Sequence, residues 1–135
     1  MQFAMHATKL VVRDVLAAER FYTALGMKPV SRNVGGEGDV HQEQAWLTHT
    51  GAMDSHLLIL TRFVELPEPP NATYPGEIWL CFQVPDVEAA IAAVEANGGS
   101  CRRPGENRPE HQVRAAVACD MEGHLIELVG PMKGA

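Results

Sequence analysis

The sequence predicts an α+β protein built from two βαβββ modules, and three observations carry this prediction. Strand and helix patterns occur in the order βαβββ twice along the 135 residues. The two halves also agree residue by residue. Residues 65–75 lie between the two halves. This segment contains four prolines and cannot form a regular element, because proline lacks an amide donor. We therefore expect an N-terminal module at 1–64 and a C-terminal module at 76–135, together forming one compact domain.

The repeat is visible in two blocks of sequence. At an offset of 72, residues 12–18 (VRDVLAA) match residues 84–90 (VPDVEAA). At an offset of 68, residues 53–60 (MDSHLLIL) match residues 121–128 (MEGHLIEL). Two matched blocks in the same order indicate an internal duplication, with the difference in offset absorbed by loops.

The first half opens with a strand pattern at 7–13, rich in β-branched residues. A helix is expected from 15 to 25, because apolar residues recur there at helical spacing. Asp14 is placed to cap its beginning and Gly26 to end it. Three further strands are predicted at 27–33, 43–49 and 55–62.

The second half repeats this order. A strand is expected at 77–84, followed by a helix at 86–97 that begins with Asp86 and ends at Gly98 and Gly99. Three more strands are predicted at 100–103, 112–119 and 124–129. The residues at 104–110 are rich in proline and glycine, so we expect a loop there.

Composition narrows the classes of partner. The net charge of −6 argues against nucleic acids and anionic membranes, since both attract basic surfaces. No apolar run approaches the roughly 20 residues of a membrane span. Arg102, Arg103 and Arg108 form a local basic cluster, for which a solvated surface is the expected role and an anion site the alternative.

Three cysteines, Cys81, Cys101 and Cys119, are widely spaced and lack a C-x-x-C pattern. They are best explained as reduced thiols in a cytoplasmic protein. The N-terminus has no basic region followed by an apolar one, so no signal peptide is expected.

The final strand pattern contains one acidic residue, Glu127, within an apolar run. A carboxylate is rarely buried without a partner, because losing its hydration costs several kcal/mol or forces protonation. Glu127 is therefore expected to face water, to be paired, or to serve chemistry.

Two signatures, Phe-Tyr-x-x-Leu-Gly-Met at 21–27 and Asp-x-x-Gly-His-x-x-Glu-Leu at 120–128, together with the duplicated module, resemble the vicinal oxygen chelate superfamily. This superfamily includes glyoxalases, extradiol dioxygenases, fosfomycin-resistance enzymes and bleomycin-binding proteins. The resemblance implies an eight-stranded, cup-shaped mixed sheet with the helices on its outer face.

The resemblance also implies where a metal would bind. Metal-dependent members hold one divalent ion with four inward ligands from the first and last strands of the two modules, usually His and Glu. The repeat locates these positions at Ala7, Ile59, Trp79 and Glu127. Three of these cannot bind a metal, and a divalent ion needs about three protein ligands or more. We predict no cofactor and disfavour a divalent metal; the fallback ligand beside Glu127 is His6, which a strand bulge would have to turn inward.

Side-chain alternation along the strands predicts the lining of the cup. It comprises Ala7, Lys9, Val11, Leu57, Ile59, Thr61, Trp79, Cys81, Gln83, Val113, Ala115, Val117, Leu125 and Glu127. Such a mixture of apolar, aromatic and a few polar groups is typical of a small-molecule pocket. The predicted ligand-binding residues are Lys9, Thr61, Trp79, Cys81, Gln83, Val117 and Glu127. Trp79 either fills the space of the missing metal or offers a stacking face to a planar ligand.

Lys9 and Glu127 are the two charged residues of this lining. They either form a salt bridge, or Lys9 binds an anionic ligand group while Glu127 acts as a catalytic proton acceptor. Cys81 is expected to pack rather than to act as a nucleophile, since no histidine is predicted beside it.

The remaining histidines are expected to serve the fold. His56 and His124 are equivalent in the repeat and should form hydrogen bonds at turns. His111 shares the alternation of the strand that follows it and could face inward, whereas His41 and His49 are expected at the surface.

The favoured interpretation is a small-molecule-binding protein of the bleomycin-resistance kind, without the usual metal site. One alternative is a metal-dependent lyase, isomerase or dioxygenase that uses Glu127. The other is a metal-free enzyme with Glu127 as general base. A homodimer is expected, because relatives commonly pair and sheet edges need cover; the modules could pair within one chain or be exchanged.

Overall fold

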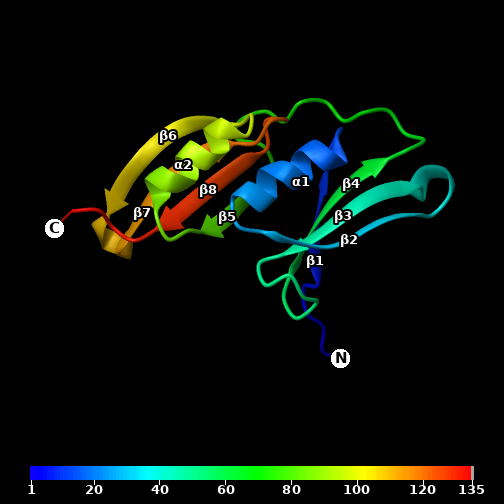
Figure 1. Ribbon diagram of the computed structural model, residues 1–135, viewed down its shortest axis with the longest axis horizontal. Coiled ribbons are helices and arrows are strands. Elements are labelled where there is room, and N and C mark those ends of the chain that lie inside the picture. Colours follow the sequence, from blue (N-terminus) through cyan, green and yellow to red (C-terminus); the bar gives the residue numbers. More distant parts are fainter. Residues whose placement is uncertain (135) are drawn as a thin grey trace. The chain divides into compact units, whose positions relative to one another are not determined.

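The computed structural model describes residues 1–134 and divides the chain into two compact units, Met1–Pro70 and Asn71 onward. The helices and strands of both are shown in Figure 1. The elements of the first unit are β1 (Ala7–Val11), α1 (Val15–Ala24), β2 (Lys28–Gly35), the 3-10 turn η1 (Gly38–Val40), β3 (Gln42–Thr48) and β4 (Leu57–Phe63).

The first unit is a four-stranded mixed sheet in the order β1-β4-β3-β2. Strand β1 pairs with β4 in parallel, and the other pairs are antiparallel. Helix α1 covers one face and buries Phe21 and Tyr22, whose rings meet edge to face with centroids 4.9 Å apart. Against them lie buried side chains of the two central strands, among them Leu47 and Leu60.

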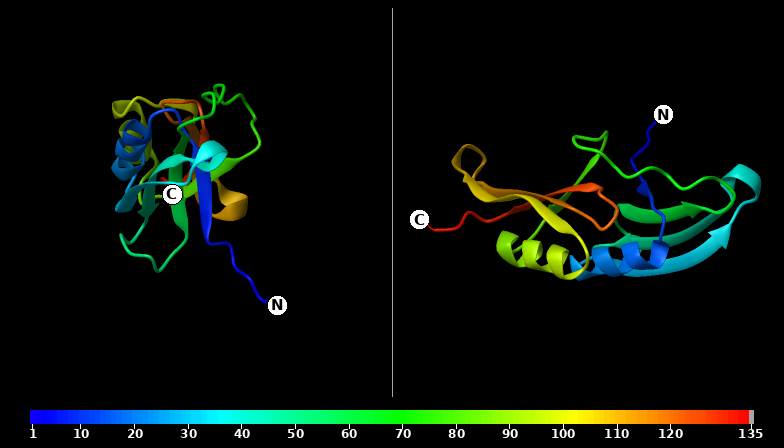
Figure 2. Two further views of the ribbon diagram at one scale, coloured as in Figure 1. Left: turned by 90° about the vertical axis from the view of Figure 1, so that its right-hand side faces the viewer. Right: turned by 90° about the horizontal axis from the view of Figure 1, so that it is seen from above.

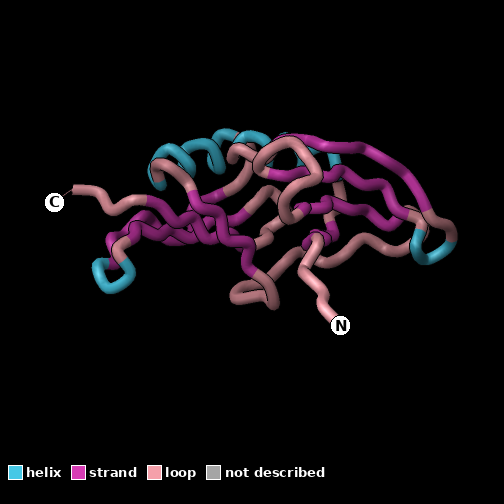
Figure 3. Tube along the Cα trace, turned by 90° about the horizontal axis from the view of Figure 1, so that it is seen from below, coloured by secondary structure: helices cyan, strands magenta, loops and turns pink. Residues whose placement is uncertain are grey.

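The second unit repeats this arrangement in the order β5-β8-β7-β6, with β5 and β8 parallel. Its elements are β5 (Trp79–Gln83), α2 (Val87–Ala96), β6 (Ser100–Arg108), the 3-10 turn η2 (Pro109–His111), β7 (Val113–Cys119) and β8 (Leu125–Gly130). Each helix lies along one face of its own sheet (Figure 2). The turns η1 and η2 occupy equivalent places, at the tips of the β2–β3 and β6–β7 hairpins (Figure 3).

Both helices begin and end with the same local chemistry. The carboxylates of Asp14 and Asp86 accept the backbone N–H groups of Ala17 and Ala89, which are otherwise left without partners in the first turn. Gly26 and Gly98 follow the helices with φ of +107° and +92°, a conformation that side chains with a Cβ rarely adopt. The predicted α+β fold of two βαβββ modules is thus confirmed.

One prediction about the C-terminal module was wrong. Residues 104–108 were expected in a loop, but β6 continues through them to Arg108. Pro104 is tolerated because β6 is the edge strand of its sheet, where a missing N–H breaks no ladder. The register with β7 shifts between Arg103 and Glu106, so Pro104 and Gly105 form an irregular segment without paired partners.

Alternating burial shows which face of the C-terminal sheet meets the helix. Ala116 and Ala118 on β7, and Ile126 and Leu128 on β8, are fully buried. The residues between them on these strands are only half-buried. The face opposite α2 is therefore the less buried face of this sheet. No helix within residues 1–134 is long and apolar enough to cross a membrane.

Candidate functional site

Four residues form a row across the open face of the C-terminal sheet. Cys81 on β5 is paired with Glu127 on β8, Glu127 with Val117 on β7, and Val117 with Arg103 on β6. Directly paired residues project to the same side of a sheet, so these four side chains share one surface. The row contains a thiol, a carboxylate, an apolar side chain and a guanidinium.

A pocket of about 470 Å³ lies over this row. Its size is within the range of small-molecule sites, which is roughly 300–1,000 Å³. All of its lining belongs to the second unit: Tyr74, Trp79, Arg103, Pro104, Glu106, Arg108, Ala115, Ala116, Val117 and Glu127. We call it the tryptophan pocket.

Two aromatic rings form one side of the tryptophan pocket. The indole N–H of Trp79 donates to the carbonyl of Pro75 at 2.6 Å, which fixes the orientation of the ring. The ring of Tyr74 lies 5.9 Å from that of Trp79, tilted by 46°, and the guanidinium of Arg102 lies over it at 3.7 Å. Because its N–H is already bonded, Trp79 has its ring face to offer to a ligand. Its exposure is 36%, and it is part of the pocket lining.

The charged residues of the pocket differ in their pairing. Arg108 forms an ion pair with Glu106, with an N–O distance of 3.6 Å. Glu127 is half-buried and accepts from the thiol of Cys81, whose Sγ lies 3.6 Å from Oε1. Arg103 forms no hydrogen bond or ion pair with any residue in the described part of the chain. Arg103 and Glu127 thus carry opposite charges but do not form an ion pair with each other.

The environment of Cys81 raises the pKa of its thiol. Burial contributes most, followed by the negative charge of Glu127 and the hydrogen bond to that carboxylate. The thiol therefore stays protonated and serves as a donor. This chemistry does not favour a thiolate nucleophile.

A second pocket of about 500 Å³ adjoins the other end of the same face. It is lined by Cys81, Gln83, Gln112, Val113, Val129, Gly130 and Pro131. Cys81 thus borders this pocket while contacting Glu127 of the tryptophan pocket. The predicted residues Trp79, Cys81, Gln83, Val117 and Glu127 all lie on this one face; their binding roles remain predictions.

The corresponding face of the N-terminal module carries a chain of hydrogen bonds centred on Gln42. Its side-chain oxygen accepts from Lys9, Gln44 and Thr61, each at 2.9 Å. Gln44 in turn accepts from the indole N–H of Trp46 at 2.8 Å. Lys9 and Thr61, predicted as ligand contacts, are thus bonded within their own module. The pairing of Lys9 with Glu127 remains a prediction, since the two residues belong to different units.

The four positions expected for a metal do not supply a metal site. Ala7 and Ile59 carry only hydrocarbon, and the indole nitrogen of Trp79 is a donor without a free lone pair. Glu127 alone offers oxygen. Within residues 1–134 no three His, Cys, Asp or Glu side chains gather as a metal would require. This donor set does not fit the divalent ion of the superfamily, and we derive no chemistry through one.

The histidines lie in varied surroundings. The ring of His56 bonds Thr8 Oγ1 at 2.8 Å and the carbonyl of Met5 at 3.3 Å. His124 bonds the buried carboxylate of Asp120 at 2.8 Å, at the turn before β8. His6, the fallback metal ligand, is exposed and precedes β1.

The other three histidines lie in turns or near the surface. His111 is exposed in the turn η2, just before β7, and its inward orientation remains a prediction. His41 contacts Glu65 at 3.3 Å, and His49 is exposed after β3.

The structure adds residues to the pocket lining that were not among the predicted ligand-binding residues. Arg103, Glu106 and Arg108 were assigned to a short strand and a loop, yet they border the tryptophan pocket. Tyr74 was assigned to the linker. The clustering of the arginines in the sequence was the signal that could have indicated their place in the pocket. The bulge at Pro104 changes the side-chain alternation, so the face of the sheet on which they lie could not be predicted.

Comparison with known proteins decides the family. The sequence model of the Glyoxalase/Bleomycin resistance protein/Dioxygenase superfamily matches residues 4–128. The chain belongs to this superfamily. The predicted resemblance is therefore confirmed at the level of the family. No curated protein matches the sequence well enough to be counted as a relative.

Solved structures of superfamily members are similar to the chain over nearly all of its length. A glyoxalase family protein from Bacillus cereus superposes with a TM-score of 0.82 at 18% identity, covering 98% of this chain and 97% of that one. The trypanothione-dependent glyoxalase I of Leishmania major gives 0.70 at 23%, covering 96% and 87%. A V278E mutant of glyoxalase I from Zea mays gives 0.76 at 23%, covering 93% of this chain and 45% of that one. At these identities the likeness concerns the fold, and a function for this superfamily member has to be argued from its pockets.

Proposed function

We propose that this superfamily member binds a small, planar organic molecule in the tryptophan pocket, without a divalent metal of the usual kind. One observation carries the proposal: a fixed indole face borders a pocket of about 470 Å³ whose lining also includes Val117 and Glu127. Stacking on an aromatic face contributes roughly 0.5–1.5 kcal/mol beyond the burial of apolar area. Four charged residues, Arg103, Glu106, Arg108 and Glu127, belong to the lining and could orient such a ligand.

The proposal is tested with a screen of small aromatic compounds by thermal shift. The hits are then titrated by tryptophan fluorescence in a Trp46→Phe background, where Trp79 is the one tryptophan left. We expect ligands to raise the Tm and to change the emission of Trp79. Trp79→Leu should remove the thermal shift, because it removes the stacking face. Hits that bind Trp79→Leu as tightly as the parent protein would contradict the proposal, as would a screen without hits.

The metal part of the proposal has its own test. Protein purified without chelators should contain no stoichiometric divalent ion by elemental analysis. Adding Mn²⁺, Fe²⁺, Ni²⁺ or Zn²⁺ should leave the Tm unchanged, because Glu127 supplies a single carboxylate where about three ligands are needed. A stoichiometric ion that is lost in Glu127→Gln would overturn this part.

A second candidate is a metal-free enzyme with Glu127 as general base. The observation that favours it is the weak pairing of this carboxylate: in the described chain, its contact is a thiol at 3.6 Å. A carboxylate beside apolar and aromatic groups is placed to accept a proton from a bound molecule. In this case Glu127→Gln should abolish turnover of a bound hit while its Kd changes little. A hit that is never converted by the parent protein would exclude this candidate for that compound.

A further inference from the structure

Two opposite charges of the tryptophan pocket lie on either side of an apolar residue. Arg103, Val117 and Glu127 are consecutive members of one cross-strand row, on β6, β7 and β8. Neighbouring strands are about 4.8 Å apart, so the backbones of Arg103 and Glu127 are separated by roughly 10 Å. No ion pair joins the two side chains. This backbone spacing is comparable with the length of one aromatic ring with a substituent on each side.

The other charges of the pocket cancel. Glu106 and Arg108 form their own ion pair, so neither is left to attract a ligand as a full charge. Arg102 lies over the ring of Tyr74, outside the lining of the pocket. Among residues 1–134, Arg103 and Glu127 therefore remain as one cation and one anion without a charged partner. A pocket of this kind is neutral in sum and polar from one side to the other.

The aromatic rings complete the pattern of recognition. Trp79 precedes Cys81 by two residues on β5, so its ring lies one row away from Glu127 on the same face. A flat ligand placed over Val117 would contact this indole while its two ends reach Arg103 and Glu127.

From this arrangement we infer the class of ligand: a planar aromatic molecule that carries an anionic group at one end, bound by Arg103, and an N–H or O–H donor at the other, bound by Glu127. The inference rests on the proposed function and deepens it. A purely apolar ligand would leave both charges desolvated without partners, which is costly. A ligand with the anion alone would place its free end against the Glu127 carboxylate.

The test uses a matched set of three probes. 4-Aminobenzoate carries both groups on one ring, benzoate lacks the donor, and aniline lacks the anion. Binding is followed by ¹H–¹⁵N NMR of the Trp79 indole signal in the Trp46→Phe background, where this signal is unique. We expect 4-aminobenzoate to bind at least tenfold more tightly than either benzoate or aniline, since each charge-assisted hydrogen bond contributes about ten- to hundredfold.

Two variants show which residue binds each end of the ligand, and a third is the control. Arg103→Gln should weaken binding of 4-aminobenzoate and benzoate by about tenfold or more, and leave aniline within twofold. Glu127→Leu should weaken 4-aminobenzoate and aniline, and leave benzoate unchanged or tighter. Arg20→Gln removes one positive charge from an exposed position on α1 and serves as the control for net charge. It should leave the affinity for every probe unchanged.

The outcomes separate the inference from the function on which it rests. If the three probes bind the parent protein within threefold of one another, the inference is wrong, although a pocket for planar molecules remains. Equal losses in Arg103→Gln and Arg20→Gln would also overturn it, because the effect would then be one of net charge. If no probe perturbs the Trp79 signal and the aromatic screen gives no hits, the proposed function itself fails.

Discussion

The thiol of Cys81 donates to the carboxylate of Glu127 across 3.6 Å, joining a possible nucleophile to the single acidic residue of β8. Burial and this contact together raise the pKa of the thiol, and the contact gives the carboxylate a weak, displaceable partner. A ligand donor that approached Glu127 would compete with a sulfur hydrogen bond and not with a strong ion pair. The site is therefore suited to exchange one donor for another.

Glu127→Gln should lower the pKa of Cys81. The variant removes the negative charge, whereas burial, the larger cause of the raised pKa, remains. The pKa should thus fall but stay above its ordinary value. The measurement is the pH dependence of iodoacetamide alkylation in a background with Cys101→Ser and Cys119→Ser. Glu106→Gln, a pocket carboxylate without contact to the thiol, is the matched control. An unshifted midpoint in Glu127→Gln would contradict the prediction.

Gly130→Ala should destabilise the protein by about 1–3 kcal/mol through overpacking. A Cβ at this position would lie 2.7 Å from the carbonyl oxygen of Val84 and 3.1 Å from Cγ2 of Val87. The clash involves backbone, so a rotamer change cannot relieve it. Gly35→Ala is the control, since a Cβ there meets nothing within 4 Å, and it should change stability by less than about 0.5 kcal/mol. Urea denaturation distinguishes the two, and equal effects would refute the steric explanation.

Removing the cap of α2 with Asp86→Ala should cost about 1 kcal/mol, since the N–H of Ala89 loses its acceptor. Asp86→Asn keeps a side-chain oxygen at the same place and should recover most of the loss. Chemical denaturation of the three proteins under identical conditions provides the comparison. The prediction does not survive if the Asn variant is as unstable as the Ala variant.

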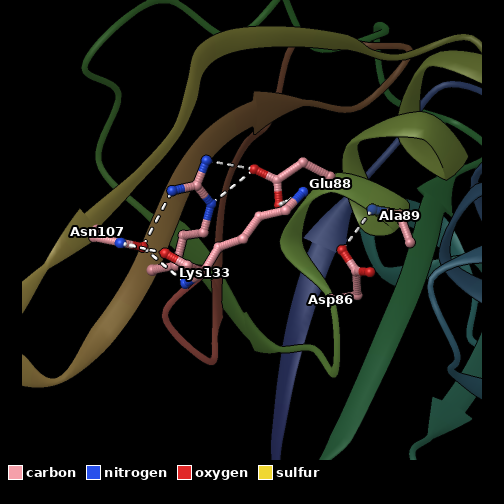
Figure 4. A network of polar contacts seen from close by, with 6 residues as sticks. Asp86, Glu88, Ala89, Asn107 and Lys133 are labelled. Atoms are coloured by element: carbon pink, nitrogen blue, oxygen red, sulfur yellow. Dashed lines mark hydrogen bonds and ion pairs between the residues drawn. The ribbon is translucent and has the colours of Figure 1, made fainter. Parts of the chain in front are cut away.

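The ion pair of Glu88 and Arg114 makes stability depend on pH. Arg114 donates from Nε at 2.7 Å and contacts the same oxygen through Nη2 at 2.6 Å, and it also bonds Asn107 (Figure 4). The hydrogen bond from Arg114 is the largest cause of the lowered pKa of Glu88. Because the folded pKa lies below the ordinary value of 4.5, the stabilisation is complete above that value and is lost as the pH falls through the folded pKa.

Glu88→Gln should therefore be less stable than the parent protein at neutral pH, with a difference that shrinks as the solution is acidified below pH 4.5. Urea denaturation across this range measures the difference. Glu95→Gln, an acidic position on the same helix with no ion pair in the described structure, should show little of this dependence. A Glu88→Gln difference that persists unchanged in acid would show that the pair contributes through packing and not through charge.

The order of the elements was predictable because its signals are local. Asp14 and Asp86 mark the helix starts, and Gly26 and Gly98 mark the ends, in the sequence as in the structure. The duplication strengthened each assignment by repeating it. The continuation of β6 through Pro104 could not be predicted in this way. It depends on pairing with a neighbouring strand and on the position of β6 at the edge of the sheet.

The site was predictable only in part, for a related reason. Alternation along regular strands placed Trp79, Cys81 and Glu127 on one face of their sheet. The face occupied by Arg103 depends on the bulge that follows it, and Tyr74 reaches the pocket from an irregular segment. The hydrogen bonds centred on Gln42 join residues far apart in the chain, so no local sequence pattern predicts them.

The two modules are related by the sequence repeat, but their polar side chains are arranged differently. In the N-terminal module, Lys9 and Thr61 both donate to the side-chain oxygen of Gln42, so these polar groups are hydrogen-bonded to one another. In the C-terminal module, Arg103 and Glu127 hold opposite charges apart across the sheet. The two sets of polar groups share no residue, so substituting Arg103 or Glu127 leaves the hydrogen bonds centred on Gln42 in place.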